Sequence, residues 1–207
     1  LLYHNDRLRT VLSMQGDTIK EIFGHDLAIK VSSIVLVGDQ SHGKTSVVEA
    51  LTGLSLPRGE NIQTRAPMEL RTKSVQNAED ESYTVSYNKD GEMVTEAFVL
   101  EDMEAVIRRA QKELIGNDYD ITDVPLIIEI NRCKQKELTI IDLPGITRVQ
   151  LKTQAADVKT KIIEMYEKYM RCEQTIIVNV VSATVDIVTA ESIELSNKYD
   201  PNAQRTI

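Results

Sequence analysis

Residues 34–45 read IVLVGDQSHGKT, and this stretch decides the fold. The unbroken apolar run Ile34–Val37 is typical of a buried strand, and the segment from Gly38 to Thr45 fits the pattern GxxxxGK[ST]. An amphipathic helical pattern follows at once. Strand, glycine-bounded loop, Lys-Thr and helix, in this order, predict a phosphate-binding P-loop.

Each part of this loop has a chemical reason. Backbone N–H groups of such a loop form a nest for phosphate oxygens, and the following helix N-terminus adds partial positive charge. Lys44 is predicted to reach the β- and γ-phosphates, and the Thr45 hydroxyl to hold Mg²⁺. A glycine- and serine-rich turn, the alternative, does not explain a Lys-Thr pair that opens a helix. The residues expected to contact a nucleotide are Gly38, Asp39, Gln40, Ser41, His42, Gly43, Lys44, Thr45 and Ser46.

Composition limits the class of protein. A chain of 207 residues with 42% hydrophobic residues can form one large domain, or one domain with a flank. Acidic residues outnumber basic ones by 32 to 24, which disfavours a general nucleic-acid or anionic-membrane surface. Cys133 and Cys172 have no metal-like spacing, and reduced thiols in a cytosolic protein are expected. No signal peptide and no membrane-spanning run are expected.

Strands that alternate with helices predict an α/β fold with a mostly parallel sheet. After the P-loop helix, further helices are expected near 101–115, from about residue 154, and near 190–199. The expected strands lie near 68–70, 83–87, 94–99, 126–130, 138–142 and 175–181. The pair 83–87 and 94–99 is expected to form a hairpin around Asp90-Gly91, and the pair 126–130 and 138–142 an antiparallel hairpin.

The two ends of the chain are predicted to lie outside the main pattern. Residues 3–23 read as a helix with an apolar stripe, which packs on the domain or against a helix beyond the C-terminus or on a partner. Residues 204–207 look like the entrance to another strand, so the chain is expected to stop inside its own fold.

Two further elements fit a phosphate site. The apolar run that ends in Asp142-Leu143-Pro144-Gly145 resembles a Walker B strand end, with Asp142 holding Mg²⁺ through water. The Gly145 amide can donate to the γ-phosphate. Thr64 lies in a loop where a threonine can ligate Mg²⁺ only when the γ-phosphate is present, as in a nucleotide switch loop. By itself, Thr64 would be an ordinary loop threonine.

The sequences GDQSHGKTSVVEALTGLSLPRGENIQTRAP, from Gly38, and IIDLPGITRV, from Ile140, together resemble the GTPase domain of the dynamin superfamily, in its Mx-like and plant dynamin-related branch. The resemblance covers residues 25–207, with residues 1–24 as a helical flank. It implies a three-layer P-loop NTPase fold with a mostly parallel central sheet, extended as in dynamins and incomplete at its C-terminal side. The long stretch of sequence between Lys44 and Asp142 also fits this resemblance, because small GTPases have a shorter one.

The resemblance implies roles for particular residues. Gln40, Ser41, Lys44 and Thr64 would be catalytic, with Gln40 and Thr64 positioning the attacking water. Ser41, with carbonyls near Gly59, would bind a monovalent cation, Na⁺ or K⁺, in place of an arginine finger, a charge worth about 10³–10⁵ in rate. Thr45, Thr64 and Asp142 would hold Mg²⁺. The implied nucleotide contacts also include Arg58, Gly59, Asp142 and Gly145.

The sequence departs from the family pattern in three ways. The second glycine of its PRGxG motif is Asn61 here, the non-glycine residue best able to adopt positive φ. His42 stands where the family has a small residue, and it is expected to be exposed, or to contact a dimer partner or the switch loop. The TKxD motif that selects guanine is absent, so preference for GTP over ATP follows from the resemblance alone.

The function predicted from the sequence is GTP binding and hydrolysis by a dynamin-like mechanochemical enzyme, activated when two GTPase domains meet. The expected partners are GTP, GDP and a second copy, with membrane contact only through parts absent from this chain and no nucleic acid. The expected location is cytoplasmic, or peripheral at membranes or the cytoskeleton. The alternatives are a catalytically weak nucleotide-binding module that pairs with full-length relatives, and a P-loop ATPase or small-molecule kinase.

Overall fold

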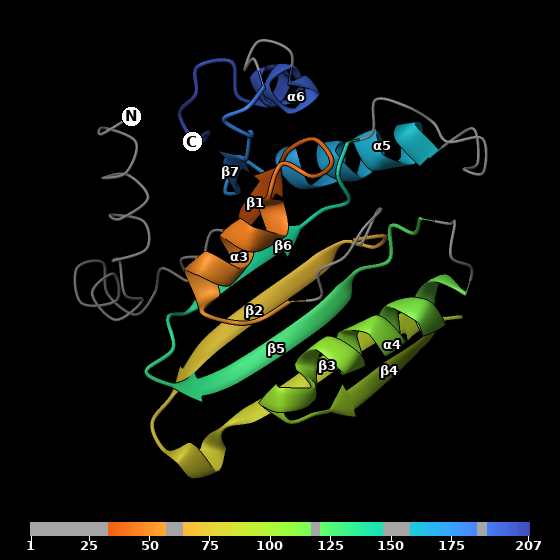
Figure 1. The fold of residues 1–207 in the computed structure, drawn as a ribbon, viewed down its shortest axis with the longest axis vertical. Helices are drawn as coiled ribbons and strands as arrows, with labels where there is room; N and C mark the ends of the chain where they lie inside the picture. Colours follow the sequence, from red (N-terminus) through yellow and green to blue (C-terminus); the bar gives the residue numbers. More distant parts are fainter. Residues whose placement is uncertain (1–32, 57–63, 117–120, 147–157, 186–189) are drawn as a thin grey trace.

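The computed structural model describes residues 33–56, 64–116, 121–146, 158–185 and 190–207. In this part of the chain, seven strands form one sheet in the order β4-β3-β5-β2-β6-β1-β7 (Figure 1). The strands are β1 (Ile34–Val37), β2 (Met68–Val75), β3 (Ser82–Lys89), β4 (Glu92–Ala97), β5 (Leu126–Cys133), β6 (Leu138–Asp142) and β7 (Ile176–Asn179). The α-helices are α3 (Lys44–Thr52), α4 (Met103–Ile115), α5 (Val158–Met170) and α6 (Glu191–Tyr199).

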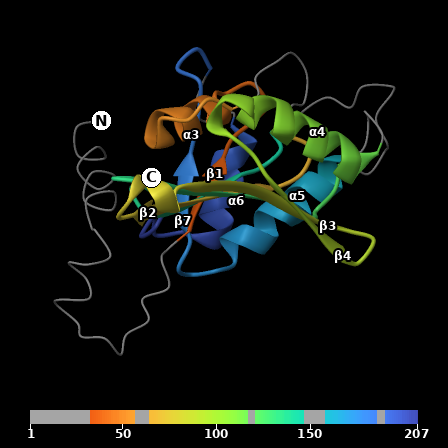
Figure 2. The ribbon, with the colours of Figure 1, turned by 90° about the horizontal axis from the view of Figure 1, so that it is seen from below.

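The sheet is covered by helices on both faces, which confirms the predicted three-layer α/β fold. Figure 2 shows α3 and α4 on one side of the sheet and α5 and α6 on the other. Strand β1 separates two cores, because Ile34 and Leu36 pack in one hydrophobic cluster and Val35 and Val37 in the other. All four side chains are at most 1% exposed, which explains the unbroken apolar run.

Parallel pairing surrounds the P-loop strand. Strand β1 pairs in parallel with both β6 and β7, and Leu36 lies opposite Asp142 on one side and Val178 on the other. Strands β2 and β5 are also parallel, whereas β2 with β6, β3 with β5, and β3 with β4 are antiparallel. Because the parallel strands β6, β1 and β7 end at one edge, the segments that follow them emerge side by side.

The expected hairpin of residues 126–130 and 138–142 is wrong. These segments, β5 and β6, do run in opposite directions, but β2 lies between them and pairs with both. Strand β2 is matched to β5 over all eight of its residues, from Met68 opposite Leu126 to Val75 opposite Cys133. Strands that follow each other in sequence usually pair directly. Here the longer pairing of β2 with β5 is favoured, because the buried side chains of both strands belong to one hydrophobic cluster.

The second expected hairpin is confirmed. Strands β3 and β4 are antiparallel, with Lys89 opposite Glu92 at the turn. Asp90 and Gly91 have φ of 54° and 91°, the left-handed conformation that a two-residue hairpin turn of type I′ requires. The Asn88 side-chain oxygen accepts a hydrogen bond from the Gly91 amide at 3.0 Å, which stabilises the turn.

The strand entrance expected at residues 204–207 is also present. Thr206 forms a parallel bridge with Ile177 of β7. The Ile177 amide donates to the Arg205 carbonyl and the Ile207 amide donates to the Ile177 carbonyl, both at 2.8 Å. The predicted helix at 3–23 lies outside the described residues. Within the described part of the chain, no helix combines the length and apolar character that a membrane span needs.

Candidate functional site

The P-loop follows β1 directly and turns on residues with positive φ. Ser41 has φ of 65° and Gly43 has φ of 92°, and α3 begins at the next residue, Lys44. A side chain at position 43 would be strained by this backbone conformation even where space is open. Gly38 is needed for a different reason, since a Cβ there would lie 2.5 Å from the Val180 carbonyl oxygen.

Lys44 points back into its own loop. Its Nζ donates to the Gly38 carbonyl at 2.9 Å and to the Asp39 carbonyl at 3.3 Å, and the residue is only 7% exposed. Burial lowers the pKa of Lys44, while the negative charges of Asp142 and Asp39 act in the opposite direction. A buried ammonium that is held by neutral carbonyls can gain a charged partner when an anion enters the loop.

Asp142 is the point at which three segments meet. It is 1% exposed, and its Oδ2 accepts hydrogen bonds from Thr45 Oγ1 at 3.0 Å and from Thr64 Oγ1 at 3.4 Å. Burial raises the pKa of Asp142, and the nearby Lys44 charge and the two hydroxyls oppose that rise. Thr45 lies in the first turn of α3, Thr64 precedes β2, and Asp142 ends β6.

This group of oxygens fits a magnesium ion. One carboxylate and two hydroxyls are hard oxygen ligands, and Mg²⁺ binds through few protein ligands of this kind with several waters. Asp142 Oδ1 is buried and has no hydrogen-bond partner among the described residues. A buried acceptor of this kind is costly unless a cation or its water completes it.

The turn after Asp142 lies directly against the P-loop. The Gln40 amide donates to the Ile146 carbonyl at 3.0 Å, and the Ile146 amide donates to the Gly38 carbonyl at 3.3 Å. A Cβ on Gly145 would lie 2.6 Å from Gln40 Cα, so a side chain there would force the two backbones apart. The glycine predicted to sense the γ-phosphate is therefore also the residue that lets the two loops touch.

A buried tyrosine completes this junction. Tyr166 on α5 is 0% exposed, and its hydroxyl donates to the Pro144 carbonyl at 2.9 Å and the Gly38 carbonyl at 3.3 Å. Sequence reasoning missed this residue. A signal was available, because Tyr166 follows Ile162 by one helical turn and a buried tyrosine hydroxyl requires a polar partner.

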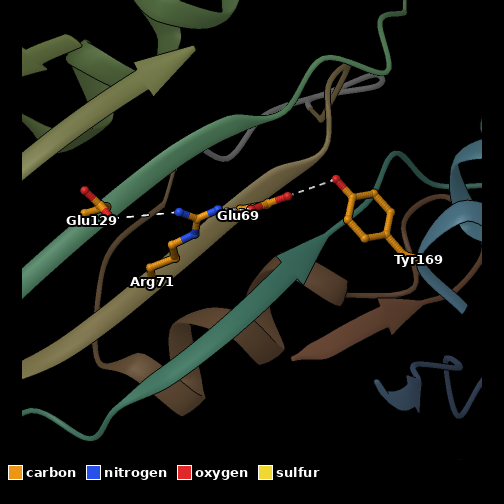
Figure 3. A network of polar contacts seen from close by, with 4 residues as sticks. All are labelled: Glu69, Arg71, Glu129 and Tyr169. Carbon is orange, nitrogen blue, oxygen red and sulfur yellow. Dashed lines mark hydrogen bonds and ion pairs between the residues drawn. The ribbon is translucent and has the colours of Figure 1, made fainter. Parts of the chain in front are cut away.

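A separate polar network joins α5 to β2. Tyr169 donates to Glu69 Oε1 at 3.1 Å, and Glu69 Oε2 accepts from Arg71 at 2.7 Å (Figure 3). Arg71 also forms an ion pair with Glu129 at 3.9 Å. The Tyr169 hydroxyl thus bonds to the sheet, whereas that of Tyr166 bonds to the two loops.

The remaining predicted site residues have different surroundings. Asp39 is buried, Gln40 is half-buried, and Ser41 and Ser46 are exposed. His42 is half-buried rather than exposed, because its Nδ1 is enclosed by protein. Arg58, Gly59 and Asn61, which were predicted to form the nucleotide and cation loop, lie outside the described residues.

Comparison with known proteins gives a consistent result. Residues 34–207 match the model of the dynamin family. The chain is similar to dynamin-related protein 4C of Arabidopsis thaliana, with 38% identity over 204 residues, which are 99% of this chain and 30% of that protein. It is 36% identical to putative dynamin-related protein 4A of the same plant over 208 residues, or 99% of this chain and 66% of that protein.

A third relative is the interferon-induced GTP-binding protein MxC of Danio rerio, 34% identical over 205 residues, which are 99% of this chain and 32% of that protein. The chain therefore spans about a third of the length of two of these three relatives.

Proposed function

Because this chain belongs to the dynamin family, we propose that it binds GTP together with Mg²⁺ and hydrolyses it to GDP and phosphate. One observation carries the proposal: Thr45 and Thr64 converge on the buried Asp142 beside the Lys44 amine. A triphosphate with its metal needs this combination of an ammonium, hydroxyls and a carboxylate. The choice of guanine is supported by the family and by the name of the Danio rerio relative.

Lys44 is proposed to exchange its carbonyl partners for phosphate oxygens. Its Nζ already lies within the loop, where it donates to the Gly38 and Asp39 carbonyls. Charge-assisted bonds to phosphate are stronger than bonds to neutral carbonyls, so the exchange favours binding. The N–H groups at the start of α3 add their partial positive charge to the same site.

Thr45, Thr64 and Asp142 are the residues that would hold Mg²⁺. When bound, the metal supplies positive charge to the phosphate oxygens. Asp142 must be ionised for this role, and the hydroxyls of Thr45 and Thr64 on its Oδ2 support that state. Thr64 lies shortly before β2, and its hydroxyl reaches the Asp142 carboxylate at 3.4 Å.

The proposed reaction is in-line attack of water on the γ-phosphorus. The new P–O bond forms as the bond to the β–γ bridging oxygen breaks, that oxygen leaves with the electron pair on GDP, and the water proton passes to the phosphate product. Gly145 would donate its amide to the γ-phosphate, and Gln40 and Thr64 would orient the water. A monovalent cation at Ser41 and Gly59, activation by a second copy, and a cytoplasmic or membrane-peripheral location are further parts of the proposal.

The test is binding of a fluorescent GTP analogue to a Lys44→Ala variant. We expect affinity to fall by at least about a hundredfold, or about 2.7 kcal/mol, because the buried ammonium is lost. Lys112→Ala, which removes an exposed lysine on α4, is the matched control and should bind as the wild type does. Equal binding by both variants would refute the phosphate site. Competition with unlabelled GTP and ATP measures the base preference, and equal competition would refute the choice of guanine.

A further inference from the structure

The Pro144–Gly145 peptide is held by a side chain that no motif contains. A peptide unit is planar, so the Pro144 carbonyl and the Gly145 N–H have directions fixed relative to each other. The Tyr166 hydroxyl donates to that carbonyl at 2.9 Å from a fully buried position on α5. A bond that fixes the carbonyl therefore also fixes where the Gly145 N–H points.

The same hydroxyl relates this peptide to the P-loop. Tyr166 lies 3.3 Å from the Gly38 carbonyl, which also accepts from Lys44 Nζ at 2.9 Å and from the Ile146 amide at 3.3 Å. If Lys44 turns to a phosphate, the Gly38 carbonyl loses its closest donor, and the Tyr166 hydroxyl remains beside it. The Gly38 carbonyl keeps the Ile146 amide as a donor in either state, so the single Tyr166 proton stays available to the Pro144 carbonyl.

Tyr166 can only act as a neutral donor here. Burial raises the pKa of Tyr166 well above its ordinary value, and the charge of Asp142 acts in the same direction. The Tyr166 hydroxyl therefore keeps its proton at neutral pH and can donate it.

We propose that Tyr166 is a positioning residue that orients the Gly145 amide toward the γ-phosphate. This inference rests on the proposed function, in which Gly145 contacts that phosphate. A triphosphate gains from the held amide, whereas a diphosphate does not reach it. Tyr166 should therefore determine the preference for triphosphate over diphosphate, and it should contribute little to the affinity for GDP.

The experiment compares Tyr166→Phe with Tyr169→Phe. Both variants remove one hydrogen-bonded hydroxyl from α5, but that of Tyr169 binds Glu69 on β2. Affinities for fluorescent GDP and for a non-hydrolysable GTP analogue are measured for each. We expect Tyr166→Phe to lower the ratio of triphosphate to diphosphate affinity about tenfold and to change GDP affinity less than about twofold. Tyr169→Phe should keep the wild-type ratio.

Two results would overturn the inference. One is an unchanged ratio in Tyr166→Phe, and the other is an equal loss of both nucleotides, which a purely structural role predicts. If the wild type itself binds neither nucleotide, the proposed function fails instead, so the two failures are distinct. A second measurement needs no variant. By NMR of ring-labelled tyrosine, the Tyr166 hydroxyl of the wild type should exchange slowly with solvent, and rapid exchange would contradict its position between the loops.

Discussion

At the scale of single residues, the site contains two buried charged groups, Lys44 and Asp142, whose mutual attraction opposes the cost of burying them. Burial shifts the pKa of Lys44 downward and that of Asp142 upward, so both groups are pushed toward their neutral forms. An anion beside Lys44 and a cation beside Asp142 would stabilise the charged forms of both groups. Binding of nucleotide and metal should therefore stabilise the folded protein in addition to preparing it for hydrolysis.

Gly145→Ala tests the contact between the two loops. Its Cβ would lie 2.6 Å from Gln40 Cα and 3.0 Å from the Gln40 amide nitrogen, both backbone atoms that cannot move aside alone. We expect a loss of about 1–3 kcal/mol in the free energy of unfolding, as for overpacking. GTP turnover should fall at least tenfold, because the amide that meets the γ-phosphate is displaced. Denaturant unfolding and phosphate release measure the two effects.

Gly53→Ala is the control for this variant. Gly53 has φ of 71° at the end of α3, with open space where a Cβ would lie, so only backbone strain is added. The Gly53→Ala variant should have a somewhat lower free energy of unfolding but the same GTP turnover per folded molecule as the wild type. Wild-type turnover in Gly145→Ala would show that the loops need not touch.

Residues named by a local motif were the ones that the sequence could place. Lys44, Thr45 and Asp142 belong to short patterns whose spacing carries the chemistry, and the structure brings them together with Thr64. Tyr166 could not be found in this way, since its importance comes from packing α5 under two loops that lie far away in sequence.

At the scale of elements, one buried carboxylate fixes the segment that follows α6. Asp200 is 6% exposed and accepts hydrogen bonds from the amides of Gln204 and Arg205 and from the Thr206 hydroxyl. The Arg205 guanidinium in turn donates to carbonyl oxygens at the ends of α5 and α6 and in the approach to β7, namely those of Met170, Cys172, Thr175 and Tyr199. These bonds hold residues 205–207 beside β7.

Asp200→Asn should therefore show a pH-dependent loss of stability. Burial acts to raise the pKa of Asp200, but the hydrogen bonds from Thr206, Arg205 and Gln204 outweigh it, so the pKa is lowered. A lowered pKa means that the stabilisation is present above the unfolded-state value near 4 and is lost as pH falls through the folded-state value.

We expect the variant to be less stable than the wild type by about 1–2 kcal/mol at pH 7, with a smaller difference below about pH 4. Chemical unfolding across this pH range measures the effect, and Asp123→Asn, whose carboxylate is exposed, serves as the control. A difference that is constant with pH would contradict the assignment.

Most elements were predictable because their patterns are local. The β3–β4 turn is specified by Asp90-Gly91, and the apolar run of β1 specifies a buried strand. The order of strands was harder. The insertion of β2 between β5 and β6 depends on pairing between distant segments, which no turn signal encodes.

At the scale of the whole molecule, the phosphate-binding elements lie together at one edge of the sheet. The P-loop follows β1 and the Asp142 turn follows β6, two parallel neighbours, and Ser41 at the loop is exposed. Strand β4 lies at the opposite end of the sheet from β1 and β7. A second copy that approached across the nucleotide would lie next to the P-loop, whereas β4 is four strands away from β6, whose end carries Asp142.

Turnover should then depend on protein concentration. If two copies pair across the nucleotide, as proposed, GTP hydrolysed per molecule and per minute should rise as the protein concentration is increased. Met93→Asp, which adds a charge at an exposed position of β4, should leave this dependence unchanged. A rate per molecule that is constant over a hundredfold range of concentration would exclude activation by pairing.

The parallel pairing of β1 also has a consequence for synthesis on the ribosome. Ile34 pairs with Ile140 on one side and with Ile176 on the other, so the neighbours of the P-loop strand are made long after it. Non-local pairing of this kind is slow, and an apolar strand is prone to aggregate until its pairing partners have been synthesised. The nascent polypeptide should gain the ability to hold nucleotide only after β6 has left the exit tunnel, and it should need chaperone protection until then.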